Sequence, residues 1–323
     1  DMIKANFVTA RKAAAMVKDG DTVCTVGMTL VSASESILKA LEKDFIETGH
    51  PCGMTLLHSC GQSDRKDGIQ HFAHEGMIKR IIGSHWGLQP RWMEMIAGNQ
   101  VEAYCLPQGQ IAQLYHSMAC GLPGKMSKVG LGTFIDPRYE GGKMNDRTKP
   151  LEDIIDIMEY RGEEYMFYRE IPIDVCIIRG TVCDEMGNLT TTEEAMKLEV
   201  LPAVLAAKRY GGKVIAQVKH VAQTGTLNPK DVTVPGVFID AIVVCDNPWE
   251  DHRQTSSWYF VPSYCGQLRV PQGNIEPALF NERKFIARRG TMELYPGAVI
   301  NLGTGIPNDM VGKVCNEERV SED

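Results

Sequence analysis

The stretch AVINLGTGIP, residues Ala298–Pro307, guides the interpretation of the whole chain. Its apolar start predicts a buried strand, the glycines that follow predict a turn, and Pro307 is a favoured first residue of a helix. A strand, a glycine turn and a helix N-terminus place backbone N–H groups at the carboxyl edge of a parallel sheet, where they suit an anion or a developing oxyanion. On these residues alone, a tight β–α connection without a ligand is the favoured interpretation.

The position of this unit predicts a second domain. The sequence stops at Asp323, soon after Pro307, whereas a parallel sheet needs several neighbouring strands with helices on both faces. The order of strand, glycine and helix around Val23 and Gly27 recurs at the same spacing around Val299 and Gly303, as a duplicated domain would leave. We therefore expect one complete domain and the first part of another, completed by a partner chain or by polypeptide outside this sequence.

The composition is that of a globular protein. Of the 323 residues, 43% are apolar and 23% are charged, which suits one large domain or two. A net charge of −7 gives no electrostatic footprint for nucleic acid, and no apolar run approaches the length of a membrane span. The ten cysteines form no Cys-x-x-Cys pair and the N-terminus has no signal-peptide core, which favours free thiols in a cytoplasmic protein.

Strand and helix patterns alternate along most of the chain. Strands are predicted at 22–27, 55–58, 76–82, 101–106, 129–132, 173–180, 188–192, 213–219 and 237–244. Helices are predicted at 9–18, 34–45, 90–98, 111–119 and 195–209. This alternation predicts the α/β class, with an open, mostly parallel sheet flanked by helices.

The remaining segments complete the predicted organisation. Residues 133–170 are looser and predict a strand-rich surface region, and residues 184–188 predict a hairpin turn. We expect a first domain at 1–246, a linker at 247–275 that is rich in Pro, Ser, Tyr and Gly, and the start of a second domain of the same architecture at 276–323.

Few residues carry an obvious chemical signature. There is no Gly-x-Ser-x-Gly elbow, no Walker loop and no Gly-x-Gly-x-x-Gly that opens a helix after the first strand. His71 and His74 could share a helical face, but no partner set has metal-ligand spacing, so no metal is expected. Gln108, beside Gly109 at a strand's carboxyl end, could donate its amide to a carboxylate; a polar loop residue is an equal alternative.

Several motifs in order resemble the family I CoA-transferases. They are Asp19-Gly-Asp-Thr-Val23, Pro107-Gln-Gly109, Val129-Gly-Leu-Gly-Thr-Phe-Ile-Asp-Pro137, Gly142-Lys-Met-Asn145, Gly180-Thr181, Asp184-Glu-Met-Gly-Asn188, Val234-Pro-Gly236 and Asn301-Leu-Gly-Thr-Gly-Ile-Pro307. The set spans nearly the whole chain, and the most similar subgroup is the single-chain propionate, acetate or acetoacetate type. The resemblance implies an α-like domain followed by part of a β-like domain.

The resemblance also implies a substrate site. Gln108 matches the glutamine that holds the substrate carboxylate, Ser59 falls where some relatives have an asparagine, and Asn301 matches an asparagine close to the catalytic glutamate. The full predicted substrate-binding set is Ser59, Gln108, Gly109, Asn301, Gly303 and Gly305. The family's nucleophilic glutamate lies C-terminal to this sequence, so no catalytic residue is predicted here. A departure is that Val26-Gly-Met28 and Ser32-Ala-Ser34 replace two usual glycine motifs of the first half, which could alter acceptor preference.

The implied reaction exchanges CoA between acids through a glutamyl-CoA thioester, with coenzyme A as a substrate and no metal or redox cofactor. The implied partners are an acyl-CoA, a small carboxylic acid, and the C-terminal half of the enzyme or a β-like subunit, in a homo-oligomer. Two alternatives stay open: an acyl-CoA hydrolase on the same scaffold, and a non-catalytic effector-binding domain of the related fold.

Overall fold

The computed structural model describes residues 4–318, apart from the side chains of residues 272 and 309. The chain divides into two compact units, Asp1–Cys265 and Gly266–Asp323. This division falls inside the segment that the sequence assigns to a linker. The identity of the second unit as the start of a domain stays a prediction.

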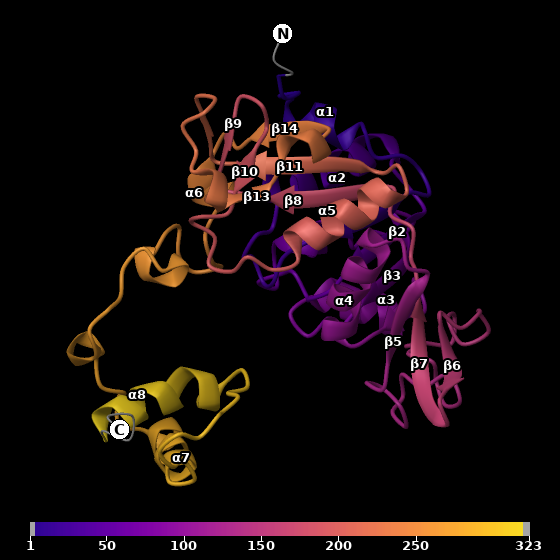
Figure 1. The fold of residues 1–323 in the computed structure, drawn as a ribbon. Helices are drawn as coiled ribbons and strands as arrows, with labels where there is room; N and C mark the ends of the chain where they lie inside the picture. The colour runs from indigo at the N-terminus through magenta and orange to yellow at the C-terminus, as the bar shows by residue number, and fades with distance from the viewer. Residues whose placement is uncertain (1–3, 319–323) are drawn as a thin grey trace. The chain divides into compact units, whose positions relative to one another are not determined.

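A seven-stranded parallel sheet forms the centre of the first unit (Figure 1), with the order β14-β11-β8-β1-β2-β3-β4. Its strands are β1 (Thr22–Thr25), β2 (Met54–His58), β3 (Ile78–Gly83), β4 (Glu102–Cys105), β8 (Val175–Arg179), β11 (Lys213–Val218) and β14 (Ala241–Val244). The inner strand β8 is buried along its whole length, as a parallel strand covered on both faces should be. The predicted fold class is confirmed.

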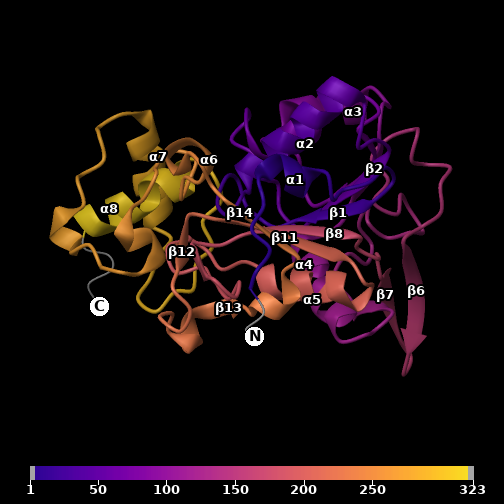
Figure 2. The same ribbon diagram turned by 90° about the horizontal axis from the view of Figure 1, so that it is seen from above.

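Helices cover both faces of this sheet. They are α1 (Ala10–Ala14), α2 (Glu35–Thr48) and α3 (Pro90–Ala97) on one face, and α4 (Gln108–Ala119) and α5 (Val200–Arg209) on the other (Figure 2). Side chains of each strand alternate between the two layers: Val23 packs with the first group of helices and Cys24 with the second. This alternation produces two apolar cores, one on each side of the sheet.

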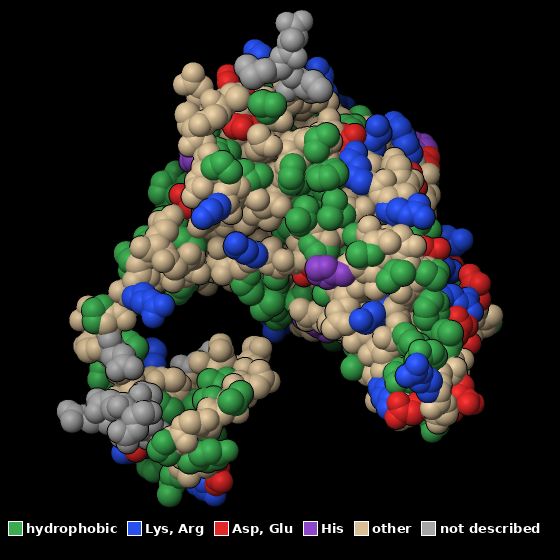
Figure 3. All heavy atoms as spheres, in the orientation of Figure 1, with side chains coloured by type: hydrophobic (Ala, Val, Ile, Leu, Met, Phe, Trp, Pro, Cys, Tyr) green, Lys and Arg blue, Asp and Glu red, His purple; other side chains and the backbone are tan. Residues whose placement is uncertain are grey.

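Two smaller sheets extend the first unit. The strands β5 (Gly124–Ser127), β7 (Glu163–Arg169) and β6 (Ile155–Tyr160) form one antiparallel sheet. Two of them, β6 and β7, lie in the region 133–170 that is predicted to be strand-rich. Apolar and charged side chains are mixed over its surface (Figure 3), where Met158 and Tyr160 are exposed. The other sheet contains β9 (Val182–Asp184), β10 (Leu189–Thr190), β12 (His220–Ala222) and β13 (Val232–Val234).

The predicted hairpin turn at 184–188 is confirmed between β9 and β10. The carboxylate of Asp184 accepts hydrogen bonds from the backbone N–H groups of Met186 (3.0 Å) and Asn188 (2.9 Å). An aspartate that bonds its own following backbone in this way closes a turn without help from distant residues.

Several predicted elements differ from the structure. Residues 129–132 form turns rather than a strand, because Gly130 and Gly132 have φ values of 101° and 72° and Asp136 accepts the N–H of Gly132. The helix predicted at 195–209 begins only at Val200, and the strand predicted at 237–244 begins at Ala241 after a 3-10 turn. The predicted linker contains a short helix, α6 (Pro248–Asp251).

The second unit is small and helical. It contains α7 (Glu282–Thr291), a π-helical turn (Pro307–Val311) and α8 (Gly312–Glu317), so a helix does begin at Pro307 as predicted. The strand predicted at 298–302 is wrong for the described chain, where this segment is irregular and the side chain of Val299 is fully exposed. A parallel strand needs neighbours for its hydrogen bonds, and the described part of this unit supplies none.

A buried ion pair and its neighbouring hydrogen bonds join four segments of the first unit. Arg179, at the end of β8, donates to both carboxylate oxygens of Glu194 (3.0 and 2.6 Å), and both side chains are nearly inaccessible to solvent. The same guanidinium also donates to the backbone carbonyls of Ala33 and Arg253, both at 3.0 Å. Burial alone would raise the pKa of Glu194, but the charge of Arg179 holds it well below its ordinary value.

Glu194→Gln should lower the free energy of unfolding by about 3 kcal/mol, because it leaves the Arg179 charge buried without its counter-charge. Urea unfolding of the full-length protein measures the change. The matched control is Glu164→Gln, which removes an exposed pair with Arg138 and should cost less than about 1 kcal/mol. Equal effects of the two substitutions would contradict the importance given to the buried pair.

Candidate active site

The carboxyl edge of the parallel sheet gathers the polar turns of the first unit. Ser59 follows β2, Ser84 follows β3 and Gln108 comes shortly after β4. Helices α4 and α5 pack against each other, and each runs from this edge toward the amino edge of the sheet. Two helix N-termini therefore lie at the edge where ligands of open α/β sheets bind.

Ser59 is buried at this edge and donates its hydroxyl hydrogen bond to the carboxylate of Glu199. Glu199 is the N-cap residue of α5 and is half-buried. The contact joins two residues that are 140 positions apart in the sequence. Sequence reasoning found Ser59 but missed Glu199, since nothing local distinguishes this glutamate from its acidic neighbours.

Gln108 and Gly109 begin helix α4, directly after Pro107 as its N-cap residue. Both residues are exposed, and a side chain added at Gly109 would meet no atom within 4 Å. The Gln108 amide is thus open to solvent at the end of β4, as its spacing predicted. Its role as a carboxylate ligand stays a prediction.

His58 lies fully buried beneath the edge. The indole N–H of Trp86 donates to its Nε2 at 3.2 Å, so Nδ1 carries the proton and donates to the carbonyl of Cys60 at 2.8 Å. Burial lowers the pKa of His58 to about 4, which keeps the ring neutral. A Cβ at Gly83 would come within 2.3 Å of this ring, so the histidine requires glycine on the neighbouring strand.

His85 holds the turn that follows Ser59. The backbone N–H of Gly61 donates to Nε2 of His85 at 3.3 Å, and the Cys60 sulfur lies 3.6 Å from the same nitrogen. Burial raises the pKa of the Cys60 thiol to about 11. Cys60 is therefore a protonated packing residue at neutral pH rather than a thiolate nucleophile.

The other predicted site residues, Asn301, Gly303 and Gly305, belong to the second unit. Asn301 and Gly303 are exposed, and the carbonyl of Gly303 accepts the N–H of Asn308 at 3.1 Å. Whether these residues join Ser59 and Gln108 in one site stays a prediction.

Two groups in the described chain bring metal-ligand atoms close together. In the first, Glu35, Asp67 and His71, both ring nitrogens of His71 are already used: Nδ1 bonds Glu42 at 2.5 Å and Nε2 bonds Glu35 at 3.1 Å. His74 also bonds Glu42, at 2.7 Å. The second group, Asp19, His50 and Cys52, lies at the opposite edge of the sheet.

Among the helices of residues 4–318, none combines the length and the apolar character needed to cross a membrane.

The fold and its open carboxyl edge agree with comparisons to known proteins. The sequence model of the coenzyme A transferase family matches residues 7–245, and the chain belongs to this family. It is 40% identical to the caffeate CoA-transferase of Acetobacterium woodii, over 98% of this chain and 60% of that protein. It is 35% identical to the acetate CoA-transferase YdiF of Escherichia coli strain K12, over 98% of this chain and 59% of that protein.

Solved structures give the same result. The apoenzyme of the acyl-CoA transferase YdiF from Escherichia coli O157:H7 matches with a TM-score of 0.88 at 32% identity, over 99% of this chain and 60% of that chain. Its thioester complex with CoA matches with a TM-score of 0.89 at 32% identity, over 99% of this chain and 63% of that chain. The family predicted from the ordered motifs is confirmed, and the chain spans about 60% of the length of these curated relatives.

Because His58 is held neutral, we expect the stability of the folded protein to fall at acidic pH. Its pKa of about 4 in the folded protein lies below the ordinary value of about 6.5, so the unfolded chain binds a proton first as the pH falls. The contribution of His58 to stability is present above about pH 6.5 and is lost toward pH 4, amounting to about 3 kcal/mol. Urea unfolding at a series of pH values measures it.

His58→Gln should reduce this pH dependence but not remove it, because burial also lowers the pKa of His252 to about 4. His116→Gln, which replaces an exposed histidine on α4, should leave it unchanged. Identical slopes in both variants would show that His58 is not the group responsible.

Proposed function

We propose that the full-length protein containing this chain transfers CoA between a short-chain acyl-CoA and a carboxylic acid of the acetate, propionate, butyrate or acetoacetate type. The observation that carries the proposal is the identity of 40% and 35%, across 98% of this chain, to two proteins named as CoA-transferases. The exposed Gln108 at the carboxyl edge of the sheet provides a physical place for the acid.

The proposed reaction proceeds by acyl exchange on a glutamate located C-terminal to Asp323. Its carboxylate attacks the thioester carbonyl and the C–S bond breaks. CoA thiolate is released, and the acyl group is now joined to the glutamate as a mixed anhydride. The thiolate then attacks the glutamyl carbonyl and releases the first acid, which leaves a glutamyl-CoA thioester. The acceptor acid reverses both steps. No net proton or electron is exchanged, and a thioester complex with CoA solved for YdiF supports this route.

This chain would contribute the binding of the acid. The amide N–H groups of Gln108 can donate to a carboxylate without placing a second full charge beside it. The N-terminus of α4 adds partial positive charge at the same edge. The hydrogen bond from Ser59 to Glu199 fixes the neighbouring turn, so that the acid meets a prearranged surface.

The second unit would be completed by further polypeptide, either the C-terminal half of the same enzyme or a β-like subunit. Its apolar side chains Val299, Ile300 and Phe280 are exposed in the described chain, and exposed apolar surface of this kind marks a missing partner. We propose domains at 1–246 and from 276 onward, with Asn301, Gly303 and Gly305 lining the site, in a homo-oligomeric enzyme.

Gln108→Ala in the full-length enzyme should lower the rate of CoA transfer by about a hundredfold, because the acid loses its orientation. Separation of the acyl-CoA products by chromatography measures the rate. Gln113→Ala is the matched control, since Gln113 is also an exposed glutamine on α4 and should leave the rate unchanged. Equal rates in both variants would remove Gln108 from the site.

The same assay separates the alternatives. A transferase forms a new acyl-CoA only when an acceptor acid is present, whereas a hydrolase releases free CoA thiol without one. A panel containing acetate, propionate, butyrate, acetoacetate and caffeate identifies the acceptor. No product with any acid and no thiol release would favour a non-catalytic domain.

A further inference from the structure

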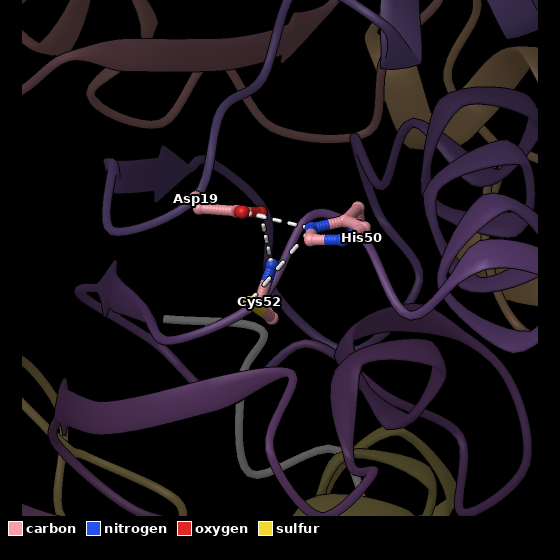
Figure 4. A group of neighbouring side chains, drawn as sticks. All are labelled: Asp19, His50 and Cys52. Atoms are coloured by element: carbon pink, nitrogen blue, oxygen red, sulfur yellow. Dashed lines mark hydrogen bonds and ion pairs between the residues drawn. The ribbon is translucent and has the colours of Figure 1, made fainter.

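A mixed cluster of side chains lies at the amino edge of the parallel sheet, away from the proposed acid site. Asp19 lies in the turn between α1 and β1, and His50 and Cys52 lie in the loop between α2 and β2 (Figure 4). Strands β1 and β2 begin just after these residues, at Thr22 and Met54. The cluster therefore joins two adjacent connections on the edge opposite to Ser59 and Gln108.

The three side chains face one another. One carboxylate oxygen of Asp19 lies 2.7 Å from Nδ1 of His50, and the other accepts the backbone N–H of Cys52 at 2.8 Å. The Cys52 sulfur lies 4.0 Å from the same histidine nitrogen. All three ligand atoms lie within 4.8 Å of one another.

We propose that Asp19, His50 and Cys52 bind a divalent transition-metal ion of the zinc type. Sulfur, imidazole nitrogen and carboxylate oxygen together are the ligands that zinc prefers, whereas magnesium and calcium select oxygen alone. With bonds of about 2.0 to 2.3 Å, a tetrahedral zinc separates its ligand atoms by about 3.3 to 3.6 Å. The observed 2.7 and 4.0 Å bracket this range, so small side-chain rotations suffice.

The surroundings allow the ion to enter. The side chains of His50 and Asp19 are 64% and 49% exposed. A contact between two such exposed groups contributes little to stability, so replacing it with bonds to an ion costs little. An open cavity of about 640 Å³, lined in part by Asp19 and His50, leaves room for water as the fourth ligand.

The cations beside this cavity are already engaged. The ammonium of Lys18 donates to the carbonyl of Ala15 at 2.7 Å, and Arg11 pairs with Asp44 at 3.5 Å and Glu47 at 3.6 Å. Neither Lys18 nor Arg11 forms an ion pair with the Asp19 carboxylate in these contacts. A bound ion would fasten the α1–β1 turn to the α2–β2 loop and so stabilise the folded state.

Cobalt provides a direct test, because a thiolate ligand gives Co²⁺ a charge-transfer absorption band in the near ultraviolet. The full-length protein, purified without a histidine tag and treated with a chelator, is titrated with Co²⁺ and then with Zn²⁺. We expect the band to appear with one ion per chain and to disappear as Zn²⁺ displaces Co²⁺. This measurement does not depend on the proposed enzymatic activity.

Variants assign the ligands. Cys52→Ser should abolish the band, and His50→Ala should weaken ion binding by more than about tenfold. Cys120→Ser is the matched control, since Cys120 is an exposed cysteine that is not part of this cluster and should keep the band. In the unmodified protein, Zn²⁺ should also protect Cys52 from iodoacetamide, as peptide mass mapping would show. Absence of the band, its persistence in Cys52→Ser, or alkylation of Cys52 at the same rate with and without Zn²⁺ would overturn the proposal.

Discussion

A parallel strand inside a domain must be hydrogen-bonded on both sides and covered by helices on both faces, and this requirement shapes the first unit. Each strand sends alternate side chains into the two helical layers, as Val23 and Cys24 do from β1. Because the chain returns through a helix after most strands, the turns that follow the strands collect at one edge. The topology of the sheet alone is enough to place Ser59 and Gln108 at this edge.

Buried polar contacts then fix this edge. Arg179 donates hydrogen bonds to Glu194 and to two backbone carbonyls. Both ring nitrogens of His58 are hydrogen-bonded, and its ring leaves no room for a side chain at position 83. Such groups are costly to leave unpaired, so the turns around them have little freedom. The proposed acid site therefore lies beside turns that buried contacts hold in place, which favours orientation of a substrate.

The sequence predicted the parallel sheet because its strands are short apolar runs separated by helical patterns. It failed at 129–132, where two glycines with positive φ and the Asp136 carboxylate favour turns, and at 298–302, where a strand lacks neighbours in the described chain. The hydrogen bond between Ser59 and Glu199 and the cluster of Asp19, His50 and Cys52 could not be predicted from the sequence for another reason. They join residues far apart in the sequence, and no local pattern records such contacts.

The central proposal is that this chain supplies the acid-binding edge while the nucleophile lies in polypeptide C-terminal to Asp323. The most direct measurement incubates the full-length protein with an acyl-CoA in the absence of acceptor, digests it, and locates the covalent CoA adduct by mass spectrometry. The account predicts a thioester on one glutamate C-terminal to Asp323, which disappears when a carboxylic acid is added. An adduct on a residue within this chain, or turnover without any adduct, would contradict it.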